Sequence, residues 1–205
     1  MINSSHHPII FPFIKNYSFL KMNRSFQSVQ IYNESIKFEN SVLLLMNHQS
    51  WWDGIWALYL NSRCWNKKVH FMMLESQLQK HWHLRYCGGY SIKPKSKSML
   101  ESIEYSIELL NDKNNLVLIF PQGEIQSMHH RDISFKAGVE RILKRQPNSN
   151  VVFGYNLIDY FSNPKPNLYM YVEEYLGKRE VVDLHQDYLL FQKRTLQSHI
   201  NNNRI

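Results

Sequence analysis

The feature that most limits the fold is an alternation of short, largely apolar runs with helical patterns along the middle of the chain. Runs at 42–45, 69–74 and 116–119 are each followed by polar turn residues and later by a helical pattern. Apolar runs of this length, bounded by turn residues, predict buried strands. Because strands that alternate with helices are typical of α/β folds, we expect one α/β domain with a central mixed β-sheet flanked by helices.

The length of 205 residues fits a single domain with a full hydrophobic core. We expect an N-terminal leader over 1–26, an α/β domain over 27–177 and a helical C-terminal tail over 178–205. Loose alternation around a turn also predicts a strand pair over 26–38. The remaining predicted strands cover 90–92, 151–157 and 168–172, and the predicted helices cover 53–60, 77–86, 98–111, 135–145 and 183–199.

A histidine and an aspartate stand at the junction between the first buried strand and the helix after it. His48 follows the strand, and Asp53 comes five residues later at the start of the helix. An aspartate in this position can accept a hydrogen bond from one ring nitrogen and leave the other nitrogen as a base. The spacing alone also allows a structural interpretation, in which Asp53 is a helix N-cap and His48 a buried histidine.

The neighbours of this pair carry a resemblance to a known family. Asn47, His48, Ser50 and Asp53 resemble the first motif of the glycerolipid (lysophosphatidate-type) acyltransferases. The similarity continues, in the family's order, over about residues 40–145, as in a short and divergent member. The other segments that resemble family motifs are Gly88–Lys93, Phe120-Pro121-Gln122-Gly123 and Phe135–Val139. The resemblance implies the same α/β fold and a role in lipid metabolism, in particular phospholipid biosynthesis.

The resemblance also implies a reaction. A fatty acyl group passes from acyl-CoA or acyl carrier protein to a hydroxyl of a lysophospholipid-like acceptor, with His48 as the general base and Asp53 orienting it. The resemblance assigns acceptor binding to Gln122, Gly123, Glu124, Lys93 and Lys95, and further motif positions to Asn47, Ser50, Phe120, Pro121 and Arg131. For the developing oxyanion we expect backbone N–H groups at the start of the helix after Asp53 or near Gly123.

The acyl donor is a co-substrate, and we expect neither a cofactor nor a metal ion. His81, His83 and Cys87 are the nearest approach to a metal-binding pattern. Two residues at i and i+2 of a helix point to different sides, and no zinc-type spacing follows them.

Two departures from the family pattern bear on the acceptor. Gln122 stands where the family usually has glutamate, and Lys93 and Lys95 flank Pro94 where the family has an arginine. These changes favour an alternative in which the same chemistry acts on an acceptor without a phosphate, such as a pigment, a glycolipid or an amino-lipid. A non-catalytic protein that binds lipid or nucleic acid is a further alternative, although no nucleic-acid-binding motif is present and we expect no nucleic-acid partner.

The net charge of +7 is consistent with attraction to anionic surfaces, or with an ordinary solvated surface. No run approaches the about 18 apolar residues that span a bilayer. Residues 11–26 mix aromatic side chains with Lys15, Lys21 and Arg24, so the leader either lies in a membrane interface or packs on the domain. Because two cysteines are too few for a disulfide framework, we expect a cytoplasmic protein, free or peripheral on the cytoplasmic face of the membrane.

Overall fold

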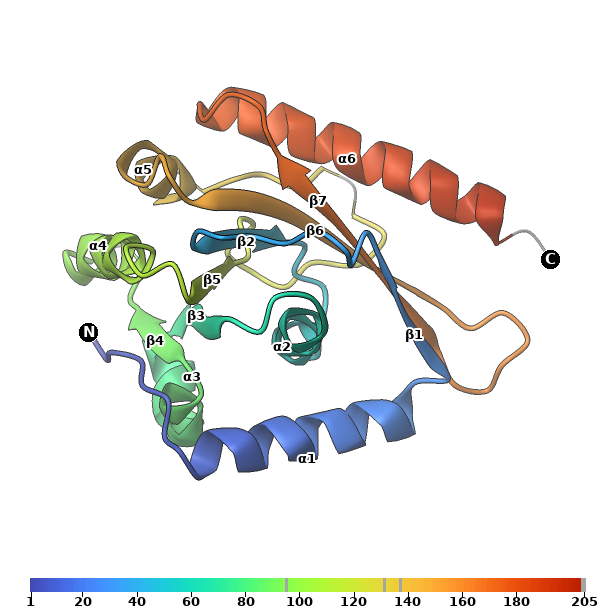
Figure 1. Ribbon diagram of the computed structural model, residues 1–205, viewed down its shortest axis with the longest axis horizontal. Coiled ribbons are helices and arrows are strands. Elements are labelled where there is room, and N and C mark those ends of the chain that lie inside the picture. Colours follow the sequence, from blue (N-terminus) through green and yellow to red (C-terminus); the bar gives the residue numbers. More distant parts are fainter. Residues whose placement is uncertain (95, 131, 137, 204–205) are drawn as a thin grey trace.

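The computed structural model describes residues 1–94, 96–130, 132–136 and 138–203. Helices and strands alternate along most of this chain (Figure 1). In chain order the elements are α1 (Ile10–Ser25), β1 (Ser28–Tyr32), β2 (Val42–Met46), α2 (Asp53–Cys64), β3 (Lys68–Leu74), α3 (Glu75–Lys80), a 3₁₀ helix (Trp82–Tyr86), β4 (Gly89–Ile92), α4 (Ser98–Leu109), β5 (Asn115–Ile119), α5 (Gly138–Arg145), β6 (Asn150–Asp159), β7 (Asn167–Tyr175) and α6 (Val181–Asn202).

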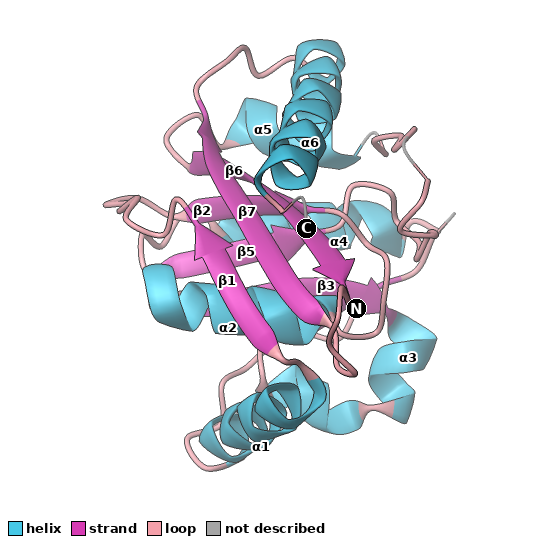
Figure 2. Ribbon diagram, turned by 90° about the vertical axis from the view of Figure 1, so that its right-hand side faces the viewer, coloured by secondary structure: helices cyan, strands magenta, loops and turns pink. Residues whose placement is uncertain are grey.

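The strands form one seven-stranded sheet in the order β1-β7-β6-β2-β5-β3-β4. Neighbouring strands are parallel except β6 and β7, which are antiparallel. β2 lies at the centre, and all five of its residues are apolar and buried because helices cover both faces of the sheet. The mixed sheet flanked by helices confirms the predicted α/β fold (Figure 2).

Alternate residues of the central strands supply two separate cores. Leu43 and Leu45 face the side that α4, α5 and α6 cover, whereas Leu44 and Met46 face α2. Figure 1 shows α1 beneath α2, on the side of the sheet opposite α6. Met22 of α1 belongs to the second core, so α1 is packed on the domain through part of its surface.

The two ends of the chain are integrated into this fold. Ser5 N–H donates to Arg85 O, and Gly88 N–H donates to Ser5 O, which fixes the leader against the segment before β4. At the other end, α6 contributes Leu184, Tyr188 and Phe191 to the core that contains Leu43 and Leu45. The domain boundaries at residues 26 and 177 stay a prediction. None of the helices in the described residues combines the length and the apolar character that crossing a bilayer requires.

Three predicted elements differ from the structure. The strand pair over 26–38 is wrong, because only β1 forms there and it pairs in parallel with β7. The helix over 77–86 is divided at His81, whose φ of −110° and ψ of 51° are not helical, into α3 and the 3₁₀ helix. The helix predicted from 135 begins at Gly138, and before it the N–H of Lys136 donates to Pro121 O.

Candidate active site

The predicted site residues gather along one edge of the sheet. Because β2, β5, β3 and β4 are parallel, their carboxyl ends share that edge, and ligands of open α/β sheets bind there. His48 follows β2, and Gln122 follows β5. Both line a crevice of about 10 Å³, the His48 crevice, to which the loop after β5 contributes Ser127, Met128, His130 and Ile133. That loop therefore borders the site, and Arg131 within it lies outside the described residues.

His48 and Asp53 form the hydrogen-bonded pair that their spacing predicts. His48 Nδ1 lies 2.7 Å from Asp53 Oδ2. The side chain of Asp53 is fully buried, and that of His48 is 23% exposed. Since an ionised carboxylate only accepts hydrogen bonds, Nδ1 carries the proton and Nε2 holds the free lone pair. The arrangement leaves Nε2 available as a base in a partly open position.

Asp53 is held by the turn that precedes it. Its Oδ2 also accepts the N–H groups of Gln49 at 2.7 Å and Ser50 at 2.8 Å. These bonds run back along the chain, and the residue at the N-cap position of α2 is Trp52, which makes no side-chain capping bond. The N-cap interpretation of Asp53 is thus wrong. Three N–H groups therefore donate to one oxygen of this buried side chain, which fixes its position beside the His48 ring.

Gln122 holds the backbone of His48 from the turn that follows β5, the neighbouring strand. Its Oε1 accepts the N–H of His48 at 2.5 Å, and its Nε2 donates to Gln126 Oε1 at 2.7 Å. The N–H of Gln126 in turn donates to His48 O at 2.9 Å. Gln122 is buried, and both ends of its amide are engaged within the protein. Gln126 was missed in the sequence, where a polar residue in a polar loop gives no signal.

The other motif residues shape the backbone around this pair. Phe120 stacks on the His48 ring, with centroids 4.1 Å apart and planes 10° from parallel. Asn47 joins β2 to β6, because its Oδ1 accepts the N–H of Asn156 at 2.9 Å. Ser50 Oγ accepts the N–H of Trp52 at 2.9 Å. These contacts fix the position of His48. Pro121 O accepts the N–H of Lys136 at 3.0 Å, and this bond fixes the loop that follows β5.

Gly123 and Glu124 form an exposed turn beside the crevice. Gly123 has a φ of +74°, in the left-handed region that favours glycine, and its N–H donates to Phe120 O at 3.0 Å. The N–H of Asp53 likewise donates to Ser50 O at 3.3 Å. The N–H groups of Gly123 and Asp53, which were among the donors expected for the oxyanion, therefore already donate hydrogen bonds within the protein. Glu124 Oε1 accepts a hydrogen bond from Gln126 Nε2 at 3.2 Å.

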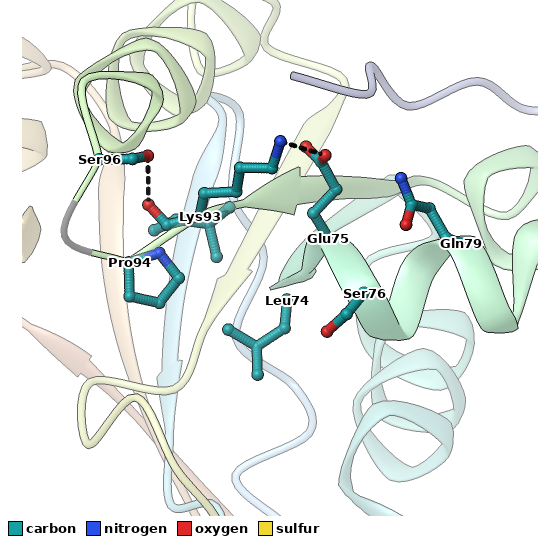
Figure 3. Close-up of a pocket in the computed structure, with 8 residues that line it drawn as sticks. Leu74, Glu75, Ser76, Gln79, Lys93, Pro94 and Ser96 are labelled. Carbon is teal, nitrogen blue, oxygen red and sulfur yellow. Dashed lines mark hydrogen bonds and ion pairs between the residues drawn. The ribbon is translucent and has the colours of Figure 1, made fainter.

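A second and larger hollow, the Glu75 groove, lies at the carboxyl ends of β3 and β4, with a volume of about 440 Å³ (Figure 3). Lys93 Nζ lies 2.7 Å from Glu75 Oε1 across it. Ser91 Oγ donates to Glu75 Oε2 at 3.0 Å. The hydrogen bond from Lys93, and then that from Ser91, lower the pKa of Glu75 against the opposing effect of burial. Lys95 lies outside the described residues.

Glu75 was not among the predicted site residues, although a signal for it existed. It directly follows a predicted strand, as His48 and the Phe120–Gly123 motif do. The rule that ligands bind beyond strand carboxyl ends therefore applies to it equally.

A metal site is not evident in the described part of the chain. No three His, Cys, Asp or Glu side chains there lie close enough together to hold a metal ion.

Comparison with known proteins adds two findings. A family model described as Acyltransferase matches residues 28–152, more than half of the chain, including His48, Asp53 and the Phe120–Gly123 motif. Among solved structures, the crystal structure of the 1-acyl-sn-glycerophosphate (LPA) acyltransferase PlsC from Thermotoga maritima is similar, with a TM-score of 0.62 and 16% identity over 91% of this chain and 79% of that chain. At this identity the likeness establishes a shared fold. No curated protein sequence matches the chain significantly.

Proposed function

The chain belongs to the acyltransferase family, and we propose that it transfers a fatty acyl group from a thioester to a hydroxyl of a lipid-like acceptor, with His48 as general base. The observation that carries this proposal is the 2.7 Å hydrogen bond between His48 Nδ1 and the buried carboxylate of Asp53. Acyl-CoA and acyl carrier protein are both suitable donors, since either presents a thioester. Neither a metal ion nor a bound cofactor takes part in the proposed chemistry.

The proposed reaction proceeds in two steps. The acceptor's hydroxyl oxygen attacks the thioester carbonyl carbon while its proton passes to His48 Nε2. Asp53 stabilises the resulting imidazolium through the bond to Nδ1. The tetrahedral intermediate then collapses, the carbon–sulfur bond breaks, and the leaving thiolate takes the proton from Nε2. The products are an ester and a free thiol, and His48 returns to its starting state.

Two acceptor classes fit this chemistry. One is a lysophospholipid-like acceptor, which the family resemblance implies; the other is an acceptor of similar size that lacks a phosphate. In either class the acyl-accepting hydroxyl has to reach His48 while the head group occupies a neighbouring part of the same sheet edge. Lipid binding without catalysis does not require a buried carboxylate that fixes the tautomer of a partly exposed histidine.

We also propose peripheral contact with a membrane, at the cytoplasmic face. Along one side of α1 the exposed fractions are 68% for Phe13, 56% for Tyr17 and 49% for Leu20, and the N-cap residue Ile9 is 74% exposed. Trp51, in the turn between His48 and Asp53, is 65% exposed. Lys21 Nζ lies 5.1 Å from the centroid of the Trp51 ring, so a cation accompanies this apolar side, as in helices that lie in a membrane interface.

The experiment that tests the function measures thioester consumption. Purified protein receives a long-chain acyl-CoA, or acyl carrier protein carrying the same chain, with a total lipid extract, and free thiol and new products are measured, the products by mass. We expect an acylated lipid that is missing with His48→Ala but formed with His199→Ala, a buried histidine far along the chain. An equal yield from the wild type and His48→Ala contradicts the proposed mechanism.

A separate experiment tests the membrane contact. Sedimentation with vesicles of phosphatidylcholine and phosphatidylglycerol is expected to recover the wild-type protein with the lipid and Phe13→Glu largely in the supernatant. The matched control is Leu190→Glu on α6, which changes a side chain that is 59% exposed on the opposite side of the sheet. Equal binding of all three proteins, or of none, contradicts contact through α1.

A further inference from the structure

We propose that the Glu75 groove is the acceptor's head-group site and that Glu75 selects an uncharged, hydroxyl-rich head group, such as a sugar, over a phosphate monoester. This inference rests on the proposed acyl transfer and names the acceptor class for it. Glu75 acts here as a specificity-determining residue, through its negative charge and through its ion pair with Lys93.

The groove lies within reach of His48. Both occupy the same edge of the sheet, because β2, β5, β3 and β4 are parallel and adjacent in that order. Neighbouring strands lie about 4.8 Å apart, which puts the end of β3 about 10 Å from the end of β2. A head group in the groove can therefore belong to the same molecule as a hydroxyl beside His48.

The lining of the groove matches the chemistry of a sugar. Lys93 offers donors, Glu75 offers acceptors, and Ser76 and Gln79 offer both. Figure 3 shows the side chains of Lys93 and Glu75 directed toward one another, with Leu74 and Pro94 supplying apolar surface below them. Alternating hydroxyls and C–H groups of a sugar ring suit such a mixture of polar groups and apolar surface.

The charges in the groove disfavour a phosphate. Among the described residues that line it, the ionisable ones are Glu75 and Lys93, which form an ion pair, and the N-terminal ammonium adds a smaller effect on Glu75 from nearby. A phosphate monoester that contacted Lys93 would also lie near the carboxylate of Glu75, and two like charges in contact repel strongly. Glu75 cannot easily turn away, because Ser91 Oγ holds its second oxygen and its side chain is 12% exposed.

Lys93 by itself is a poor anchor for an anion while Glu75 is ionised. Its ammonium group already contacts the carboxylate at 2.7 Å. Because the pKa of Glu75 is lowered, this carboxylate keeps its charge at neutral pH. Replacing Glu75 with glutamine keeps the shape and the hydrogen bond from Ser91, removes the negative charge and frees the ammonium for a phosphate.

The test compares acceptors with a single acyl-CoA. Wild-type protein receives lysophosphatidate, monoacylglycerol and a monoacylated galactosylglycerol, and kcat/KM is measured for each. We expect the galactolipid to exceed lysophosphatidate by at least about tenfold, and Glu75→Gln to shift this ratio about tenfold toward lysophosphatidate. The matched control is Glu140→Gln on α5, where an exposed Glu140–Lys144 pair at 2.6 Å has the same chemistry outside the groove.

The outcomes separate the two proposals. Wild-type protein that prefers lysophosphatidate and loses it with His48→Ala supports the acyl transfer and overturns the head-group assignment. A ratio that Glu75→Gln leaves unchanged, with its melting temperature equal to that of the wild type, overturns the assignment of Glu75. Absence of His48-dependent transfer to any acceptor overturns the proposed function, and the head-group assignment with it.

Discussion

The described residues contain two hydrogen-bonded His–Asp pairs that are opposite in burial. In His48–Asp53 the carboxylate is fully buried and the histidine is partly open. In His199–Asp159 the histidine is 4% exposed and the aspartate 43% exposed, although the Nε2–Oδ2 distance of 2.6 Å is similar. A short His–Asp contact by itself therefore does not mark a catalytic pair.

The difference lies in the second ring nitrogen. His199 Nδ1 is engaged by the hydroxyl of Tyr171 at 2.8 Å and by Asn203 Nδ2 at 3.2 Å, so both nitrogens of this ring serve to attach α6 to the sheet. His48 uses only Nδ1 among the described residues. A base needs a free lone pair that a substrate can reach, and of these two rings only that of His48 provides one.

The largest contrast is expected in turnover. His48→Ala removes the proposed base and is expected to lower kcat about 10²- to 10⁴-fold, whereas His199→Ala is expected to leave it within about threefold of the wild type. Thiol release from acyl-CoA measures both, and circular dichroism checks that each variant is folded. If His199→Ala lost as much activity as His48→Ala, the two pairs would not differ in the way that their burial indicates.

Replacing the aspartate of each His–Asp pair with asparagine tests the same contrast through the residue that holds the histidine. Asp53→Asn keeps the shape but presents an amide that cannot hold the protonated Nδ1 in the same way, so we expect kcat to fall about 10- to 10³-fold with little change in KM. Asp159→Asn is the matched control and is expected to retain kcat. Equal kcat values for the two variants contradict an orienting function of Asp53.

A third histidine shows what burial does without a carboxylate partner. Burial, followed by the nearby charge of His6, lowers the pKa of His70 to about 4. Below its ordinary pKa of 6.5 the unfolded chain binds a proton that the folded protein does not, so stability is lost as the pH falls from about 6.5 to about 4. The loss due to His70 amounts to about 3 kcal/mol at its limit.

Urea unfolding at pH 7 and pH 4.5 measures this effect. The free energy of unfolding is expected to fall less between these pH values in His70→Gln than in the wild type, because glutamine does not titrate. Identical pH dependence of the two proteins contradicts a neutral, buried His70 in the folded state.

The smallest expected effect concerns the stability that the His199–Asp159 pair provides. His199→Ala leaves the partly buried hydroxyl of Tyr171 without its ring partner and is expected to lower the free energy of unfolding by about 2 kcal/mol. Tyr171→Phe removes the hydroxyl together with its need for a partner and is expected to cost about 1 kcal/mol. Urea unfolding measures both.

Much of the site was predictable because its first half is local. Strand, turn and helix start follow one another within 42–60, so the contact between His48 and Asp53 depends on a single turn. The family match confirms the resemblance that these motifs carry. The contacts from Gln122 and Gln126 to His48 were not predictable, because they join segments more than seventy residues apart.

The sequence by itself determined the α/β class, the strands of the sheet's centre and the His48–Asp53 turn, since apolar periodicity and short-range hydrogen bonds are encoded within a few neighbouring residues. Only the tertiary structure decided that β1 pairs with β7, that Lys93 meets Glu75 rather than standing free, and which of the two His–Asp pairs is open. Sheet order and burial depend on how distant segments pack against one another, and no local pattern records that choice.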